Sequence, residues 1–425
     1  MAKVRTIADG VRICTVQTDR FKSAFIGVSM VVPMTGNLSA NALLIKVLKH
    51  SCKKYPDFVK LNRKLDELYG ASIAAGFSKK GEAQMLDLEI SCIDDRFALK
   101  SGEKITAECA ELISGMLFNP DVKKGAFKSD IVDEERRFLL QDIEEEINNK
   151  RTYAQKKCVS IQCRNELFGK RIYGTKEEIE ALTPEDLYEA WQNLLRTATF
   201  LITCVSSDDC RQVERIFKKG FSKIERQPAE ITTEFRTRPG KFRRVEEQFP
   251  VNQGKLVLGF RTGKKNKEDN FAAYVLAADI FGGNVYSKLF LNVREKLSLC
   301  YYCWARLISE KGLLMVDCGI DTENEKKATD EILAQLKAVC DGDFTDDDIK
   351  ASVMGMRERW LSMDNPGAIC GWYSTQITDE TLCTPEEKVA LLEKVTKKEI
   401  CAAAKHIKLE AAYMISAQEG EKDEA

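Results

Sequence analysis

The 425-residue chain contains only two histidines, His50 and His406. Zinc sites in proteins draw on three or four convergent ligands, and histidine is among the commonest of them. Ser-His-Asp and Cys-His catalytic groups also need a histidine beside the nucleophile. We therefore expect no metal site built on His50, which is predicted to be a partly exposed residue in a turn, and no nucleophilic triad.

The chain also lacks a dominant charge and long hydrophobic runs. Its formal net charge is −1, so no basic field favours nucleic acid. Residues 1–21 contain no long apolar run, and later apolar segments are interrupted by charges, so we expect neither a signal peptide nor a membrane span. Fifteen cysteines without a secretion signal favour free thiols in a reducing cytosol. These absences predict a cytoplasmic protein with no membrane or nucleic-acid partner.

The strongest positive signal is a plan that occurs twice. A predicted strand over 23–32 leads to a helix containing Asn41, and a strand over 254–262 leads to a helix over 270–283. Each half continues with a short charged helix, a strand, a turn containing Lys and Gly, and another strand, over 62–90 and 291–320. This repeated order predicts two domains of one α+β design.

The later elements of each half follow the same order. Each half has a further helix, a helix start led by phenylalanine, and a capped helix followed by a final strand. Thr183 before Pro184, and Thr345 three residues before Asp348, mark two of the helix starts. The polar stretch with Pro and Gly between the halves has little apolar periodicity, as expected for a domain boundary. We predict domains over 1–225 and 245–425, joined by a linker over 226–244.

One stretch, "LAADIFGGNVYSKLFLNVREKLSLCYY" (276–302), is the most specific. It resembles the pitrilysin/insulinase family of metallopeptidases, especially the half-size members similar to mitochondrial processing peptidase. The family has there a Gly-rich turn, a Ser-x-Leu-Phe helix start and an Arg-Glu-Lys motif before a tyrosine, with Ser298 and Cys300 standing here for small residues. The matching residues are Gly282, Gly283, Ser287, Leu289, Phe290, Arg294, Glu295, Lys296, Leu299 and Tyr301.

The resemblance implies two homologous domains, each a mostly antiparallel sheet of about six strands packed with helices, forming half of a clamshell. Active members carry His-x-x-Glu-His on the first helix, where the two histidines share a face and bind zinc. The 49–56 turn puts Asn41 and Ile45 at the histidine positions and Leu44 at the glutamate. The further glutamate ligand falls near Asp142. We therefore expect no zinc in this chain.

The Arg294 and Tyr301 pair, in contrast, is intact. In the family these two residues of the second domain close over the site made by the first. The tyrosine hydroxyl can donate to a developing oxyanion, and the arginine can hold substrate carbonyls. Neither role needs a metal in the same subunit.

The resemblance therefore implies a zinc-less subunit of a bacterial-type peptidase, inactive alone. It would pair with a zinc-bearing paralogue, or form a homodimer, supply Arg294 and Tyr301 in trans, and act on peptides or unfolded chains. One alternative is a proteolytically inactive structural or assembly partner in a larger complex. Another is an autonomous enzyme with unfamiliar metal ligands.

Two other patterns contain candidate ligand residues. Cys300 and Cys303 form a C-x-x-C, but on a predicted strand their sulfurs should point to opposite faces, which disfavours a redox or metal role. The acidic run over 142–150 is interpreted as a solvated helix face rather than a carboxylate metal cluster.

Overall fold

The computed structural model describes residues 2–265, 268 and 270–418. The chain forms two compact units, and each unit draws on both halves of the sequence. The first unit runs up to Asp142 and also includes 171–232 and 362–384. The second includes 143–170, 233–361 and the chain from Pro385 onward. Both units combine one sheet with several helices, which confirms the predicted α+β class.

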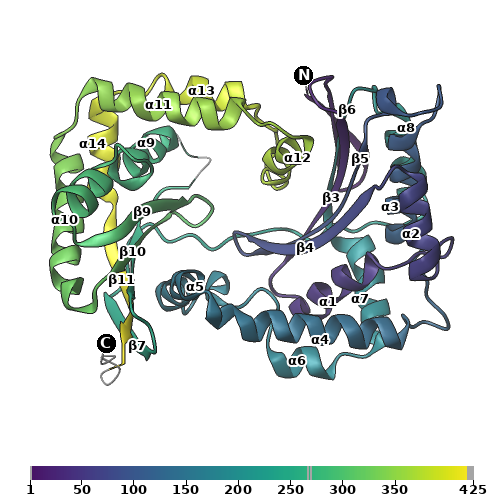
Figure 1. Ribbon diagram of the computed structural model, residues 1–425, viewed down its shortest axis with the longest axis horizontal. Coiled ribbons are helices and arrows are strands. Elements are labelled where there is room, and N and C mark those ends of the chain that lie inside the picture. The colour runs from purple at the N-terminus through teal and green to yellow at the C-terminus, as the bar shows by residue number, and fades with distance from the viewer. Residues whose placement is uncertain (1, 266–267, 269, 419–425) are drawn as a thin grey trace, which may run out of the picture. The chain divides into compact units, whose positions relative to one another are not determined.

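The first unit is built on a six-stranded sheet in the order β1-β2-β6-β3-β5-β4 (Figure 1). All neighbouring strands are antiparallel except β2 and β6, which run parallel. This arrangement agrees with the predicted, mostly antiparallel sheet of about six strands. The strands are β1 (Ala2–Ala8), β2 (Val11–Gln17), β3 (Ser23–Pro33), β4 (Ser72–Lys80), β5 (Ala83–Ile93) and β6 (Thr199–Ser206).

Helices cover both faces of this sheet, with α3 and α8 on one side and α12 on the other (Figure 1). The close approach of α12 depends on Gly27 of β3. A Cβ atom at that position would lie 2.5 Å from the Cys370 sulfur of α12. The helices of this unit are α1 (Leu38–Leu48), α2 (Phe58–Glu67), α3 (Ile105–Phe118), α4 (Ser129–Glu145), α6 (Lys176–Ala181), α7 (Pro184–Thr197), α8 (Arg211–Phe221) and α12 (Pro366–Ser374), with a 3-10 turn η1 (Asp95–Phe97).

The second unit has a five-stranded sheet in the order β7-β11-β8-β10-β9. Only β7 and β11 are parallel. This order and these directions match those of β2-β6-β3-β5-β4 in the first unit, so the repeat seen in the sequence is a repeat of topology. The strands are β7 (Arg243–Phe249), β8 (Gly254–Arg261), β9 (Cys300–Ile308), β10 (Leu313–Ile320) and β11 (Lys408–Ala417).

The helix α5 belongs to the second unit, although it lies in the first half of the sequence. Its Ala154 and Cys158 pack with Val257 of β8 and Tyr413 of β11. The predicted domains, 1–225 and 245–425, follow one another along the chain. In the structure, each compact unit also contains one segment from the other half of the sequence. The helical segments of this unit are α5 (Lys150–Gln162), α9 (Phe271–Gly282), α10 (Glu325–Asp341), α11 (Asp346–Leu361), α13 (Pro385–Leu392), α14 (Lys397–His406), the π-helix η4 (Leu289–Lys296) and the 3-10 turns η2 (Glu146–Asn148), η3 (Leu167–Gly169) and η5 (Thr322–Asn324).

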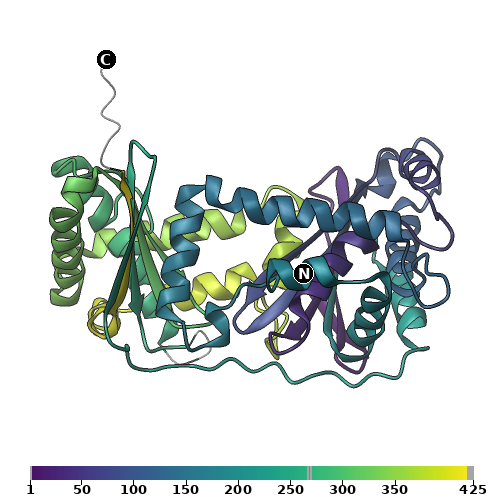
Figure 2. The same ribbon diagram turned by 90° about the horizontal axis from the view of Figure 1, so that it is seen from below.

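The stretch between α8 and β7 contains no helix or strand (Figure 2). It corresponds to the predicted linker over 226–244, except that β7 begins inside it at Arg243. Strand β7 has little apolar pattern in the sequence, because its residues are mostly charged and, among the described strands, it pairs with β11 alone at the edge of the sheet.

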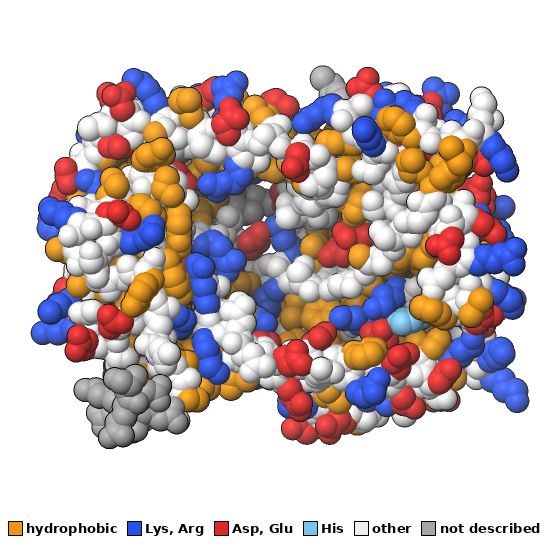
Figure 3. All heavy atoms as spheres, in the orientation of Figure 1, with side chains coloured by type: hydrophobic (Ala, Val, Ile, Leu, Met, Phe, Trp, Pro, Cys, Tyr) orange, Lys and Arg blue, Asp and Glu red, His pale blue; other side chains and the backbone are white. Residues whose placement is uncertain are grey.

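The surface and the helices reflect the nearly equal numbers of basic and acidic residues and the short apolar runs of the sequence. On the face drawn in Figure 3, basic and acidic side chains are interspersed. Among the described residues, every helix is too short or too polar to cross a membrane.

Candidate functional site

Helix α1 carries the three predicted zinc-motif positions, and all three are buried. Leu44 and Ile45 are fully buried, and Asn41 is 8% exposed. The Asn41 amide donates to Gln84 Oε1 of β5 at 3.0 Å, while Gln84 donates to two backbone carbonyls. These contacts make α1 an ordinary core helix at these positions, held in place by apolar packing and by the amide pair with Gln84.

The fourth predicted position, Asp142 on α4, contacts α1 one residue beyond Ile45. Its Oδ2 lies 3.4 Å from Nζ of Lys46. Ala42 lies four residues before Lys46 and shares a helix face with it, as the two histidines of the motif would, and Ile45 takes the glutamate position one residue before Lys46. Read in this register, the motif positions would be Ala42, Ile45 and Lys46 instead of Asn41, Leu44 and Ile45.

Neither register supplies a histidine or a carboxylate on α1. Aliphatic side chains offer no lone pair, the Asn41 amide is paired with Gln84 and is not among the usual zinc ligands, and an ammonium repels a metal cation. The residues at these positions therefore do not fit zinc.

His50 lies just beyond the end of α1, where it pairs with a carboxylate. Its Nε2 is 2.5 Å from Oε1 of the buried Glu135 on α4, and Nζ of Lys49 is 3.3 Å from the same oxygen. Burial alone would raise the pKa of Glu135, but the hydrogen bond to His50 and the charge of Lys49 outweigh it and lower that pKa. His50 thus joins the end of α1 to α4 through the Glu135 carboxylate.

Strand β9 presents Tyr301 through a β-bulge. Residues 302–308 pair one by one with β10, but Cys300 pairs with Ile320, next to the Gly319 partner of Tyr302. Tyr301 is therefore the extra residue, and it is 63% exposed. Bulges of this kind redirect a side chain at the end of a strand pair. Among the described strands, β9 pairs only with β10, so it lies at the edge of the sheet.

Arg294 lies in the last turn of the π-helix η4, immediately before β9. The backbone N–H of Leu299 donates to the Val293 carbonyl at 3.0 Å and holds this helix end against the start of the strand. The guanidinium lies 4.5 Å from the ring centroid of Phe290 and 3.6 Å from the Glu295 carboxylate. Its side chain is 41% exposed. Arg294 therefore retains donors for a ligand, and it belongs to the same unit as Tyr301.

The prediction that the Cys300 and Cys303 sulfurs point to opposite faces is wrong. These two sulfurs and that of Cys318 on β10 all lie within 4.8 Å of one another. The bulge at Tyr301 is the reason, because one extra residue places positions 300 and 303 on the same face. The sequence carries no local sign of this bulge, and Cys318 lies on a different strand.

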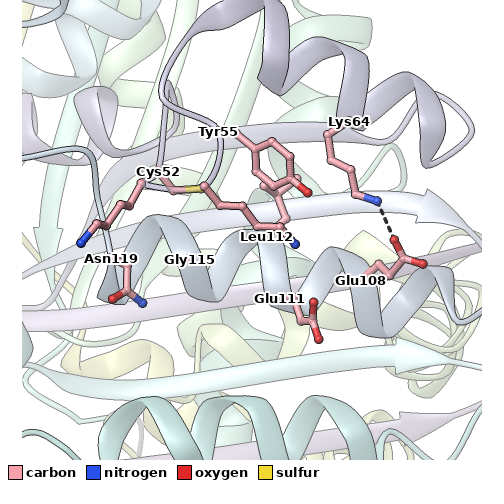
Figure 4. Close-up of a pocket in the computed structure, with 10 residues that line it drawn as sticks. Cys52, Tyr55, Lys64, Glu108, Glu111, Leu112, Gly115 and Asn119 are labelled. Atoms are coloured by element: carbon pink, nitrogen blue, oxygen red, sulfur yellow. Dashed lines mark hydrogen bonds and ion pairs between the residues drawn. The ribbon is translucent and has the colours of Figure 1, made fainter.

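The first unit also has a pocket that no local sequence pattern indicates. It has a volume of about 380 Å³ and lies between α3 and the turn from Cys52 to Tyr55. Figure 4 shows Tyr55, Lys64 and Glu108 around it, with Lys64 Nζ 2.5 Å from Glu108 Oε2. Its lining segments are far apart in sequence, so only the fold brings them together.

Comparisons with known proteins find relatives along almost the whole chain. Residues 181–356 match the family model described as "Peptidase M16 inactive domain". The chain is 30% identical over 407 residues to the "Probable inactive metalloprotease YmfF" of Bacillus subtilis (strain 168), and the match covers 95% of each protein.

Solved structures agree with this match. A conserved protein from Enterococcus faecalis V583 is similar with a TM-score of 0.86 and 25% identity, covering 99% of this chain and 100% of that one. The peptidase M16 inactive domain from Pseudomonas fluorescens has a TM-score of 0.81 at 15% identity, with the same coverage. The second likeness shows a shared fold.

Proposed function

Because this chain belongs to the peptidase M16 family, the pitrilysin/insulinase metallopeptidases and their inactive homologues, we propose that it is a subunit without zinc that is inactive alone. It contributes Arg294 and Tyr301 to a peptide-cleaving site completed by a zinc-bearing paralogue. The observation that carries this proposal is the bulge on β9, which directs Tyr301 outward next to the helix end that carries Arg294.

The composition of α1 supports the assignment of zinc to the partner. Asn41, Leu44 and Ile45 are part of the core. The α1 residue that contacts Asp142 is Lys46, which is a cation and not a metal ligand. A zinc ion would have to displace this packing without gaining a nitrogen or thiolate ligand from the helix. This subunit therefore uses α1 for stability and leaves the metal to its paralogue.

Arg294 and Tyr301 have the chemistry to act on a peptide held by another subunit. A tyrosine hydroxyl can donate a hydrogen bond to a carbonyl oxygen as it gains negative charge. A guanidinium can bind backbone carbonyls and orient the chain being cleaved. In the described sheet β9 is an edge strand, and an edge strand can accept an extended peptide as an additional strand. The substrate is accordingly a short or unfolded peptide.

The alternative is a structural or assembly partner that binds other subunits without taking part in cleavage. Exposed apolar side chains near η4 favour it, because such side chains are typical of protein contact surfaces. These residues are Val285, Tyr286, Leu291 and Leu297.

The test is to mix this chain with the zinc-bearing M16 paralogue of the same genome and follow cleavage of a quenched fluorescent, unstructured peptide. We expect cleavage only in the mixture. Arg294→Ala and Tyr301→Phe should each lower it by roughly 10²-fold, the usual effect of removing one oxyanion donor. Arg357→Ala is the matched control, since Arg357 is an exposed arginine on α11 of the same unit.

The outcomes separate the two functions. Full cleavage by the mixture when both Arg294 and Tyr301 are replaced would refute a shared site. A stable complex that neither cleaves nor binds peptide, measured by light scattering on size exclusion and by peptide titration, would favour the assembly role.

A further inference from the structure

We propose that Cys300, Cys303 and Cys318 form a binding site for a soft, thiophilic metal ion, and that Cu(I) is the ion that fits it best. Each residue offers one sulfur, and the three sulfurs lie within 4.8 Å of one another. The residues are 8%, 0% and 1% exposed, respectively. The site is independent of the proposed function of Arg294 and Tyr301.

The sheet holds the three thiols in place before any ion binds. Cys303 and Cys318 are direct partners across β9 and β10, and the bulge turns Cys300 to the same face. Their surroundings belong to the main hydrophobic core of the second unit. Ligands carried on paired strands are held more precisely than ligands on loops, which favours a preformed site.

The number and type of donors favour Cu(I). Thiolates are soft ligands that select Cu(I), zinc and iron–sulfur clusters. A structural zinc site is closed by four ligands. In the described part of the chain, the group contains three sulfurs and no fourth His, Cys, Asp or Glu.

The geometry needs only a small adjustment. Three sulfurs each about 2.3 Å from a metal in a trigonal plane lie roughly 4 Å apart. The Cys303 and Cys318 sulfurs are 2.7 Å apart, so a modest rotation of one side chain would open the site. Binding exchanges the S–H protons for the metal and releases them to solvent, and copper stays in the Cu(I) state, so no electron is transferred.

The experiment is an anaerobic titration of the full-length, phosphine-reduced protein with Cu(I), in competition with the colorimetric chelator bathocuproine disulfonate. The chelator suppresses weak binding to the other cysteines. We expect one tight equivalent per chain, falling to none in Cys303→Ala and in Cys318→Ala. Cys158→Ala is the matched control, because Cys158 is a buried thiol of the same unit outside the group, and it should keep the full equivalent.

Two further measurements keep the test decisive. If the cluster variants do not fold, X-ray absorption of the copper-loaded wild type should show three sulfur neighbours around each copper. A Zn²⁺ titration in parallel should show weaker binding. The proposal is overturned if reduced protein binds no tight Cu(I), if Zn²⁺ binds more tightly, or if all variants bind alike. It is equally overturned if mass spectrometry finds that the thiols only form a disulfide.

Discussion

Arg261 of β8 lies at the centre of a buried group of charges, and replacing it should strongly destabilise the second unit. Its Nε is 2.8 Å from Glu410 Oε2, and its Nη2 is 3.0 Å from Glu166 Oε1. Lys311 Nζ is 2.6 Å from the other oxygen of Glu166, and the Gln162 amide donates to Glu410 at 2.9 Å. Burial alone would lower the pKa of Arg261, but its carboxylate partners raise it overall.

The magnitude follows from the charge balance of this group. Two cations face two carboxylates, and all four side chains are at most 2% exposed. Arg261→Met keeps most of the volume but takes from the buried Glu410 its cationic partner, while Glu166 keeps Lys311 and the partly exposed Arg236. Removing one partner of a buried ion pair costs about 3–5 kcal/mol. Removing the opposite charge as well, in Arg261→Met with Glu410→Leu, should recover about 2 kcal/mol, because an uncharged replacement is often tolerated.

The assay should resolve the two units, since a single unfolding free energy is not well defined for a protein of several domains. Hydrogen exchange of peptides from β8 and β11 measures the opening free energy of the second unit directly. Arg244→Met is the control, because Arg244 forms an exposed pair with Glu325 and such pairs contribute about 0.2–1 kcal/mol. If Arg261→Met lowers the opening free energy of the second unit by no more than Arg244→Met does, the reasoning is refuted.

Three further predictions concern the first unit. Asn41→Leu leaves Gln84 Oε1 buried without its donor and should lower the free energy of unfolding by about 1–3 kcal/mol, measured by thermal unfolding. An unchanged melting temperature would mean that the amide pair does not hold α1 in place. Thr183→Ala removes the capping box of α7 and should lower the free energy of unfolding by about 0.5–2 kcal/mol, measured by urea unfolding. Thr183→Ser keeps the hydroxyl and should leave that free energy nearly unchanged, so equal losses in the two variants would argue against the cap. Because the pKa of Glu135 is lowered in the folded state, its contribution to stability is present above its unfolded value and lost as pH falls through the folded one. His50→Ala should therefore weaken the acid dependence of the urea midpoint between about pH 3 and 6, and a curve parallel to wild type would contradict this.

Local patterns in the sequence were enough to predict the repeated elements. Strand β3 and helix α9 coincide closely with the predicted ranges 23–32 and 270–283, because apolar composition and length identify buried segments without knowledge of their partners. The caps at Thr183 and Thr345 form as predicted, since a side chain and backbone three residues apart need no other contact. The sequence of α1 likewise shows directly that this helix contains no histidine.

The sequence alone therefore determined the α+β class, the duplication, the family and the lack of zinc ligands on the first helix. Only the tertiary structure decided that α5 packs in the second unit and α12 in the first, that Lys46 is the α1 residue facing Asp142, and that a bulge turns Tyr301 outward. The same bulge brought Cys300 and Cys303 to one face beside Cys318. The reason is physical: these features depend on contacts between segments distant in sequence, where the pairing partner and not the local pattern sets the orientation of each side chain.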